Sequence, residues 1–150
     1  MSAVLTHSLN TQWHGSHEIG FTSGEVFTTV CSFSNGIAVG SRLGVVTIGN
    51  EPPVQLGNGP VRHLVHFQGN LWAACAGQLH HFSNGKWSST PGEPTGLEVD
   101  SKGRLWSILG GRVRLEGKPV SLPLSRPWCL LATPTTLWIG ASDGVLQVHY

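Results

Sequence analysis

The chain has 150 residues, of which 20 are glycine and 9 are proline; only 11% are charged, and its net charge is +1. Low charge argues against a coiled coil or a long exposed helix, and the lack of a basic excess argues against a nucleic-acid partner. A hydrophobic share of 39% is enough for a packed core, which excludes general disorder.

Short apolar segments separated by turn residues recur along the chain. The clearest copies begin at Ile37, Leu71, Leu105 and Leu137, so they start 34, 34 and 32 residues apart. Period-two spacing predicts a first strand upstream of each copy, around residues 29–31, 63–65, 97–99 and 129–131. Gly-containing turns then predict third strands at residues 45–48, 79–82, 113–115 and 145–148. Weaker fourth strands are expected at residues 54–56, 86–88 and 119–122.

Each copy is therefore a predicted four-stranded antiparallel sheet, and the sequence contains no long helical apolar period. One such sheet cannot bury both of its faces, but several copies packed around an axis can. The sequence thus predicts an all-β protein, a β-propeller of about four blades; a stacked β-solenoid is the competing repeat fold. The expected repeats are residues 25–57, 58–92, 93–124 and 125–150, in a single domain with a closing segment at residues 1–24.

The fourth repeat ends at Tyr150, just after its third strand. Counting back 34 residues from Val54 reaches Gly20, so residues 18–21 are expected to supply the missing strand. A ring closed by N- and C-terminal strands leaves no exposed sheet edge. A monomeric four-bladed ring is favoured; the alternative is a homodimer that shares one ring or swaps strands.

The segment 137–145 resembles the LWIG-x-x-x-GL core of the two-component-regulator propeller repeat family. The resemblance covers about residues 25–150 and implies a propeller blade, but no particular function. Propellers of that family usually have many more blades and belong to membrane-spanning sensor kinases, and neither a transmembrane segment nor a kinase part is visible here. The matching positions, which we expect to be structural anchors, are Leu71, Trp72, Leu105, Trp106, Leu137, Trp138, Gly140 and Gly144.

Tryptophan and histidine are the side chains that could carry binding chemistry. Trp72, Trp106 and Trp138 recur at one repeat position, which favours packing between blades over a ring of aromatic platforms for sugars or cations. Trp13 and Trp128 fall outside that register and are candidates for exposed contacts.

The eight histidines form loose pairs, among them His63 with His66 and His80 with His81. On strands the members of each of these two pairs point to opposite faces, so neither pair chelates a metal alone. The sequence also contains no acid/base carboxylate pair, no nucleophile elbow and no phosphate-binding loop. We therefore predict no catalytic residue, no metal and no cofactor.

These observations favour a non-catalytic binding or scaffold module whose partner is another protein, docked on one rim. Loops at residues 50–60 and 91–96, which are long and poorly charged, fit that role. The alternatives are a small-ligand or glycan-binding propeller and a propeller lyase-type enzyme. The candidate binding residues are Arg42, His63, His66, His80, His81, Asp143, Trp13 and Trp128.

The cysteines and the N-terminus bear on the compartment. Cys31, Cys75 and Cys129 are odd in number and far apart, which favours free thiols in a reducing setting. Residues 1–10 do not resemble a secretory signal, and no apolar run is long enough to span a bilayer. The sequence therefore predicts a cytoplasmic protein without a membrane partner.

Overall fold

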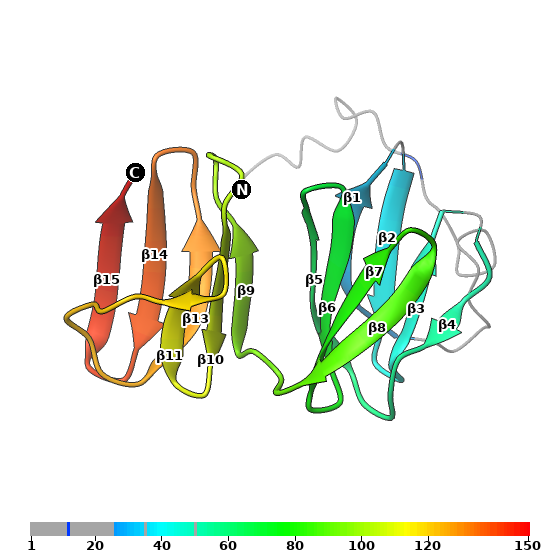
Figure 1. Cartoon of the computed structure of the whole chain (residues 1–150), viewed down its shortest axis with the longest axis horizontal. Helices are drawn as coiled ribbons and strands as arrows, with labels where there is room; N and C mark the ends of the chain where they lie inside the picture. The colour runs from blue at the N-terminus through cyan, green and yellow to red at the C-terminus, as the bar shows by residue number, and fades with distance from the viewer. Residues whose placement is uncertain (1–11, 13–25, 35, 50) are drawn as a thin grey trace, which may run out of the picture.

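The computed structural model describes residues 12, 26–34, 36–49 and 51–150 (Figure 1). Within this part of the chain every regular element is a β-strand, and the strands form four separate antiparallel sheets. In each sheet, strands that follow one another in sequence are hydrogen-bonded neighbours. The four sheets are the blades of a β-propeller, as the repeats predict.

The strands of the four blades have the following bounds. Blade 1 contains β1 (Phe27–Phe33), β2 (Gly36–Ser41), β3 (Val45–Ile48) and β4 (Val54–Gln55). Blade 2 contains β5 (Val61–Phe67), β6 (Asn70–Cys75), β7 (Gln78–Ser83) and β8 (Lys86–Pro91). Blade 3 contains β9 (Gly96–Val99), β10 (Leu105–Leu109), β11 (Arg112–Leu115) and β12 (Lys118–Pro119). Blade 4 contains β13 (Pro127–Ala132), β14 (Thr136–Ala141) and β15 (Gly144–His149); its expected fourth strand, residues 18–21, lies outside the described residues.

Tight turns hold the strands of blade 2 together. Each of its three turns ends in a glycine with a φ of +76°, namely Gly69, Gly77 and Gly85. The residue before each glycine also has a positive φ, as in Asn84 at +53°. Two successive positive φ values twist a two-residue turn in the direction that matches the twist of the flanking strands. Local sequence therefore determines these hairpins.

The first strand of each blade lies nearest the axis. Strand β5 contacts β1 and β9, and β9 contacts β13. These four strands begin at the same end of the propeller, which we call the start rim. The turns that connect the second and third strands of each blade lie at the start rim as well.

The leucine and the tryptophan at the anchor positions of blades 2, 3 and 4 are adjacent in sequence and face opposite neighbouring blades. Leu71 is fully buried against blade 1, and Leu137 is fully buried against blade 3. Trp106, 4% exposed, packs toward blade 4. Alternation along a strand explains this arrangement, because adjacent side chains point to opposite faces of the sheet. The equivalent residue of blade 1, Ile37, is 45% exposed.

The buried apolar side chains form two cores, one for each pair of blades. The first core joins blades 1 and 2 and includes Ala38, Val61 and Leu71. The second core joins blades 3 and 4 and includes Ile108 and Ile139. Figure 1 shows the corresponding two groups of sheets, β1–β8 and β9–β15. The contact between β5 and β9 and the segment that leads from β8 to β9 connect them.

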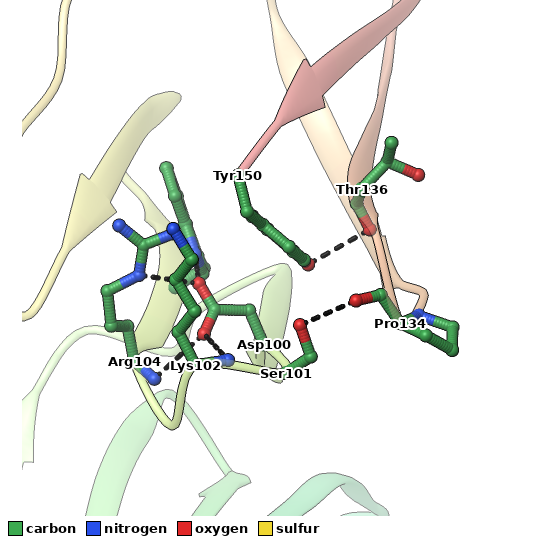
Figure 2. Close-up of polar contacts among 8 residues, drawn as sticks. Asp100, Ser101, Lys102, Arg104, Pro134, Thr136 and Tyr150 are labelled. Carbon is green, nitrogen blue, oxygen red and sulfur yellow. Dashed lines mark hydrogen bonds and ion pairs between the residues drawn. The ribbon is translucent and has the colours of Figure 1, made fainter.

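The turn between β9 and β10 is organised by the carboxylate of Asp100, which is only 5% exposed (Figure 2). Its Oδ1 accepts hydrogen bonds from the backbone N–H groups of Lys102 and Arg104, each at 2.9 Å. Its Oδ2 accepts hydrogen bonds from Arg104 Nε and Trp106 Nε1, each at 2.8 Å. Burial raises the pKa of Asp100, but these hydrogen bonds and the Arg104 charge outweigh it and hold the pKa below 3.8. Asp100 is thus a structural turn residue.

Beside this turn, side chains connect blades 3 and 4 (Figure 2). Ser101 Oγ donates a hydrogen bond of 2.8 Å to the carbonyl oxygen of Pro134. The hydroxyl of Tyr150 donates one of 2.9 Å to the carbonyl oxygen of Thr136, and its ring lies 5.5 Å from the Arg104 guanidinium carbon. The polar network therefore stabilises the seam that the second core buries.

Candidate functional site

A cavity of about 670 Å³ opens at the start rim, and all four blades contribute to its wall. Blade 1 provides Thr28, and blade 2 provides residues 60–63. The loop before β9 provides residues 93–95, and blade 4 provides Trp128 and Cys129. Because the first strand of every blade begins here, the propeller architecture itself brings these distant segments together. We call this space the axial cavity.

One wall of the axial cavity carries an ion pair between blade 2 and the loop before β9. Arg62 Nε lies 3.5 Å from Glu93 Oε1, and the Arg62 side chain is 63% exposed whereas that of Glu93 is 21% exposed. The backbone N–H of Gly77 donates a hydrogen bond of 3.2 Å to Glu93 Oε2. Glu93 Oε1 is buried and accepts no hydrogen bond. This carboxylate oxygen therefore pairs with the Arg62 charge and keeps the capacity to accept a hydrogen bond.

His63 lies next to this pair and is held by the same loop. Its Nε2 lies 3.1 Å from the carbonyl oxygen of Thr95, so this nitrogen carries the proton and donates. Burial lowers the pKa of His63; the Thr95 hydrogen bond and Glu93 oppose this effect, and Arg62 adds to it. The net result is a pKa below 6.5, which leaves a neutral imidazole at neutral pH.

Threonines complete the polar lining. Thr28 Oγ1 donates a hydrogen bond of 2.6 Å to the carbonyl oxygen of Val61, and so links blade 1 to blade 2. Thr95 Oγ1 is buried and has no hydrogen-bond partner. Glu93 Oε1 and Thr95 Oγ1 are thus two buried oxygen atoms that form no hydrogen bond with the described residues, and Glu93 Oε1 is ion-paired with Arg62.

Exposed apolar side chains lie on the start rim, and one of them lines the cavity. Trp128 lines the cavity and is 67% exposed. Leu43, in the turn between β2 and β3, is 56% exposed, and Val145, at the start of β15, is 68% exposed. Exposed large apolar groups on one rim are a feature of surfaces that bind other molecules.

The structure brings four of the eight predicted binding residues to the start rim. His63 and Trp128 line the axial cavity, and Trp128 is exposed, as expected. Arg42 and Asp143 lie in equivalent turns of blades 1 and 4. The backbone N–H of Arg42 donates to the carbonyl oxygen of Val26, and Asp143 Oδ1 accepts a hydrogen bond of 3.2 Å from the backbone N–H of Ser125.

The other candidates lie elsewhere. The ring of His66 contacts Phe33 edge-on, with centroids 5.2 Å apart. His80 is 4% exposed, and its Nε2 lies 3.0 Å from the carbonyl oxygen of Cys75. His81 stacks on Trp72 on the opposite face of blade 2. Trp13 lies outside the described residues.

The sequence pattern did not single out Arg62, Glu93 or Thr95. It did name the loop at residues 91–96 as a binding loop, and that loop supplies Glu93 and Thr95. Across residues 26–34, 36–49 and 51–150, together with Gln12, no three His, Cys, Asp or Glu side chains are grouped to hold a metal ion. The same part of the chain contains no helix with the length and apolar character needed to cross a membrane.

Neither the comparison with protein-family models nor that with curated proteins gives a match. Solved structures, in contrast, match with high probability at low sequence identity. The WD40 β-propeller domain of Doa1 is 15% identical with a TM-score of 0.57, and the match covers 83% of this chain and 50% of that one. The extracellular domain of the putative one-component system BT4673 from B. thetaiotaomicron is 18% identical with a TM-score of 0.61, and the match covers 83% of this chain but 21% of that one.

Virginiamycin B lyase from Staphylococcus aureus is 14% identical with a TM-score of 0.52, over 79% of this chain and 54% of the lyase. The chain thus spans about half the length of the Doa1 domain and about a fifth of the BT4673 domain. At these identities the likeness concerns the fold alone, and the resemblance to the two-component-regulator repeat stays a prediction. The chain has the fold of a four-bladed β-propeller.

Proposed function

We propose that this chain is a non-catalytic binding module that holds a segment of another protein at the start rim. The observation that carries the proposal is Trp128, an exposed tryptophan on the wall of a cavity to which all four blades contribute. Tryptophan and arginine are enriched among the residues that dominate protein interfaces. Arg62, at the same mouth, has a largely exposed side chain.

The lining indicates the chemistry of the bound segment. Glu93 Oε1, which is ion-paired with Arg62, and Thr95 Oγ1 are buried and form no hydrogen bond with the described residues. The carboxylate oxygen can only accept, so it favours a ligand that donates N–H groups, whereas the Thr95 hydroxyl can donate or accept. Trp128, on the wall of the same cavity, favours an apolar side chain beside that donor. An extended peptide with an apolar anchor residue and free backbone N–H groups supplies both.

Selection from a random-peptide display library tests this function. We expect peptides with a shared aromatic or leucine anchor, and titration calorimetry of the selected peptides should show a loss of at least tenfold in affinity for Trp128→Ala. Ile37→Ala removes a comparably exposed apolar side chain at the opposite rim, and should bind like the unchanged chain. Selected peptides that bind Trp128→Ala as tightly as the unchanged chain would contradict the proposal.

The lyase alternative has its own test in His63, because a neutral imidazole in a cavity can act as a general base. A turnover of virginiamycin B that is lost in His63→Ala while the variant stays folded would favour the enzyme. The three free thiols, Cys31, Cys75 and Cys129, are consistent with our expectation of a reducing, cytoplasmic setting.

A further inference from the structure

A second cavity, of about 330 Å³, lies between blades 2 and 3, away from the start-rim site. Phe67, Trp72 and Leu79 form its blade 2 wall, and Leu97, Leu105 and Ser107 form its blade 3 wall. We call it the interblade cleft. It separates the two apolar cores, because the first core ends in blade 2 and the second begins in blade 3.

The face of blade 2 that lines the cleft carries two buried nitrogen atoms without a hydrogen-bond partner among the described residues. One is Trp72 Nε1, and the other is Nε2 of its cross-strand neighbour His81. The two rings are stacked, with centroids 4.0 Å apart and planes inclined by 15°. The indole N–H can only donate, so Trp72 requires an acceptor atom that the described part of the protein does not supply.

The face of blade 3 that lines the cleft carries a third such nitrogen, in a residue beside the lining residue Ser107. Arg114 is paired with Ser107 across β10 and β11, so both side chains are on the face that lines the cleft. Arg114 Nε is buried without a partner, although Nη1 donates a hydrogen bond of 3.4 Å to the carbonyl oxygen of Gly117. Buried N–H groups without acceptors are rare in folded proteins, and two on facing walls require an explanation.

We propose that the interblade cleft binds a compact aromatic carbonyl compound. Its ring packs between Trp72 and the leucines of the two walls, and its carbonyl oxygen accepts the hydrogen bond of Trp72 Nε1. The carboxylate of Glu116 lies at the exposed edge of the cleft, which favours an uncharged acceptor over a carboxylate. At roughly 30 Å³ for a group the size of water, the volume accommodates on the order of ten non-hydrogen atoms.

The two cavities differ in the hydrogen bonds that they offer. The axial cavity offers the carboxylate of Glu93, which accepts hydrogen bonds from donors, whereas the interblade cleft offers the indole N–H of Trp72, which requires an acceptor. The inference therefore does not depend on the peptide-binding function and can fail or succeed separately.

Acetophenone is the probe, because it combines one ring with one carbonyl oxygen. In ¹H–¹⁵N spectra of the unchanged chain, we expect the Trp72 indole signal to move downfield with increasing acetophenone. Trp72→Phe keeps an aromatic ring and removes the N–H, and should weaken binding at least fivefold by calorimetry. Trp87→Phe is the matched control, because Trp87 Nε1 is also buried and unpartnered but packs against the core on the other face of blade 2.

The control should change the acetophenone affinity by less than twofold. The proposal is wrong if the Trp72 signal does not move up to about 10 mM acetophenone, ten times a weak millimolar Kd. It is equally wrong if Trp72→Phe, shown to be folded by circular dichroism, binds as tightly as the unchanged chain. The Trp72 indole measurement uses the unchanged chain, so it tests the binding of acetophenone even if Trp72→Phe does not fold.

Discussion

Asp100 shows how much a single buried carboxylate can organise. Its two oxygen atoms accept four hydrogen bonds, from two backbone N–H groups, the Arg104 side chain and the Trp106 indole. All four donors lose their acceptor if the carboxylate is removed, and a buried donor left unpaired costs more than a typical hydrogen bond contributes. The residue therefore stabilises the β9–β10 turn and the anchor tryptophan of blade 3 together.

Asp100→Asn is expected to lower the free energy of unfolding by about 2 kcal/mol, measured by urea denaturation. The matched control is Asp143→Asn on the exposed start rim, where one long hydrogen bond is at stake and the loss should stay below about 0.5 kcal/mol. The Asp100 contribution is complete above pH 3.8 and is lost as the pH falls through its lower pKa in the folded chain. Equal losses in the two variants would contradict this account.

The burial of His63 predicts a second pH dependence of the stability. It originates in the desolvation of a base, whereas that of Asp100 originates in the hydrogen bonds of an acid. Burial lowers its pKa below 6.5, so the unfolded chain takes up the proton first as the pH falls. The stabilisation is complete above 6.5, and the melting temperature should fall between about pH 7.5 and about pH 5.5. His63→Gln should flatten this fall, whereas His66→Gln should keep it, because His66 is exposed. A fall of the same size in all three proteins would show that His63 is not its source.

At the scale of the element, a glycine in the second strand of blade 1 determines how closely the first strand of blade 2 can approach that strand. A Cβ at Gly40 would lie 2.8 Å from Val61 Cβ and 2.9 Å from Thr29 Cγ2. Val61 is fully buried in the core between blades 1 and 2. The glycine of β2 therefore allows β5 to pack directly on blade 1.

Gly40→Ala is expected to destabilise the protein by about 1–3 kcal/mol, because the added methyl group overpacks a buried seam. Gly36→Ala lies at the start of the same strand with no atom within 4 Å of the added Cβ, and should change stability little. Chemical denaturation of the two variants side by side measures the difference. A neutral Gly40→Ala would mean that blades 1 and 2 are free to move apart.

Local sequence predicted these elements well. The alternation of side chains predicted that His63 and His66, and likewise His80 and His81, lie on opposite faces, and the strand register confirms it. The fourth strand of blade 3 was predicted at residues 119–122 but is β12, a two-residue strand that begins one residue earlier. Strand β12 forms only a short pairing with β11, and Pro123 and Pro127 follow nearby. The sequence therefore does not specify the residue at which this strand ends.

For the whole molecule, the separation of the apolar side chains into two cores predicts two units of cooperative unfolding. Leu71 belongs to the core of blades 1 and 2, and Leu137 to that of blades 3 and 4. Truncation of a buried leucine to alanine costs roughly 2–5 kcal/mol. If the cleft between blades 2 and 3 separates the units, that loss should appear locally.

Hydrogen exchange followed by mass spectrometry tests this division. Leu71→Ala should accelerate exchange in strands β1–β8, and Leu137→Ala in strands β9–β15. The two variants are matched in chemistry and in burial, since both leucines are fully buried. Uniform acceleration over all strands in both variants would instead show one cooperative unit.

The size of the assembly follows from the axial cavity. Because four blades of one chain line it, we propose a monomeric ring, with an expected mass of 16.0 kDa by light scattering. A mass twice as large at every concentration would contradict this proposal and show that the ring is closed at an interface between two copies of the chain.

The sequence by itself determined the repeat, the strands and their turns, and therefore the propeller, because hairpins and side-chain alternation are local. It also made Trp128 a candidate for an exposed contact, since that residue falls outside the repeat register, and the side chain is 67% exposed. Only the tertiary structure decided that Arg62, Glu93 and Thr95 meet in the axial cavity, and that Trp72 faces blade 3 with its N–H unpaired. Alternation assigns a side chain to a face of its sheet, but the distance and angle between sheets come from the packing of whole blades against one another.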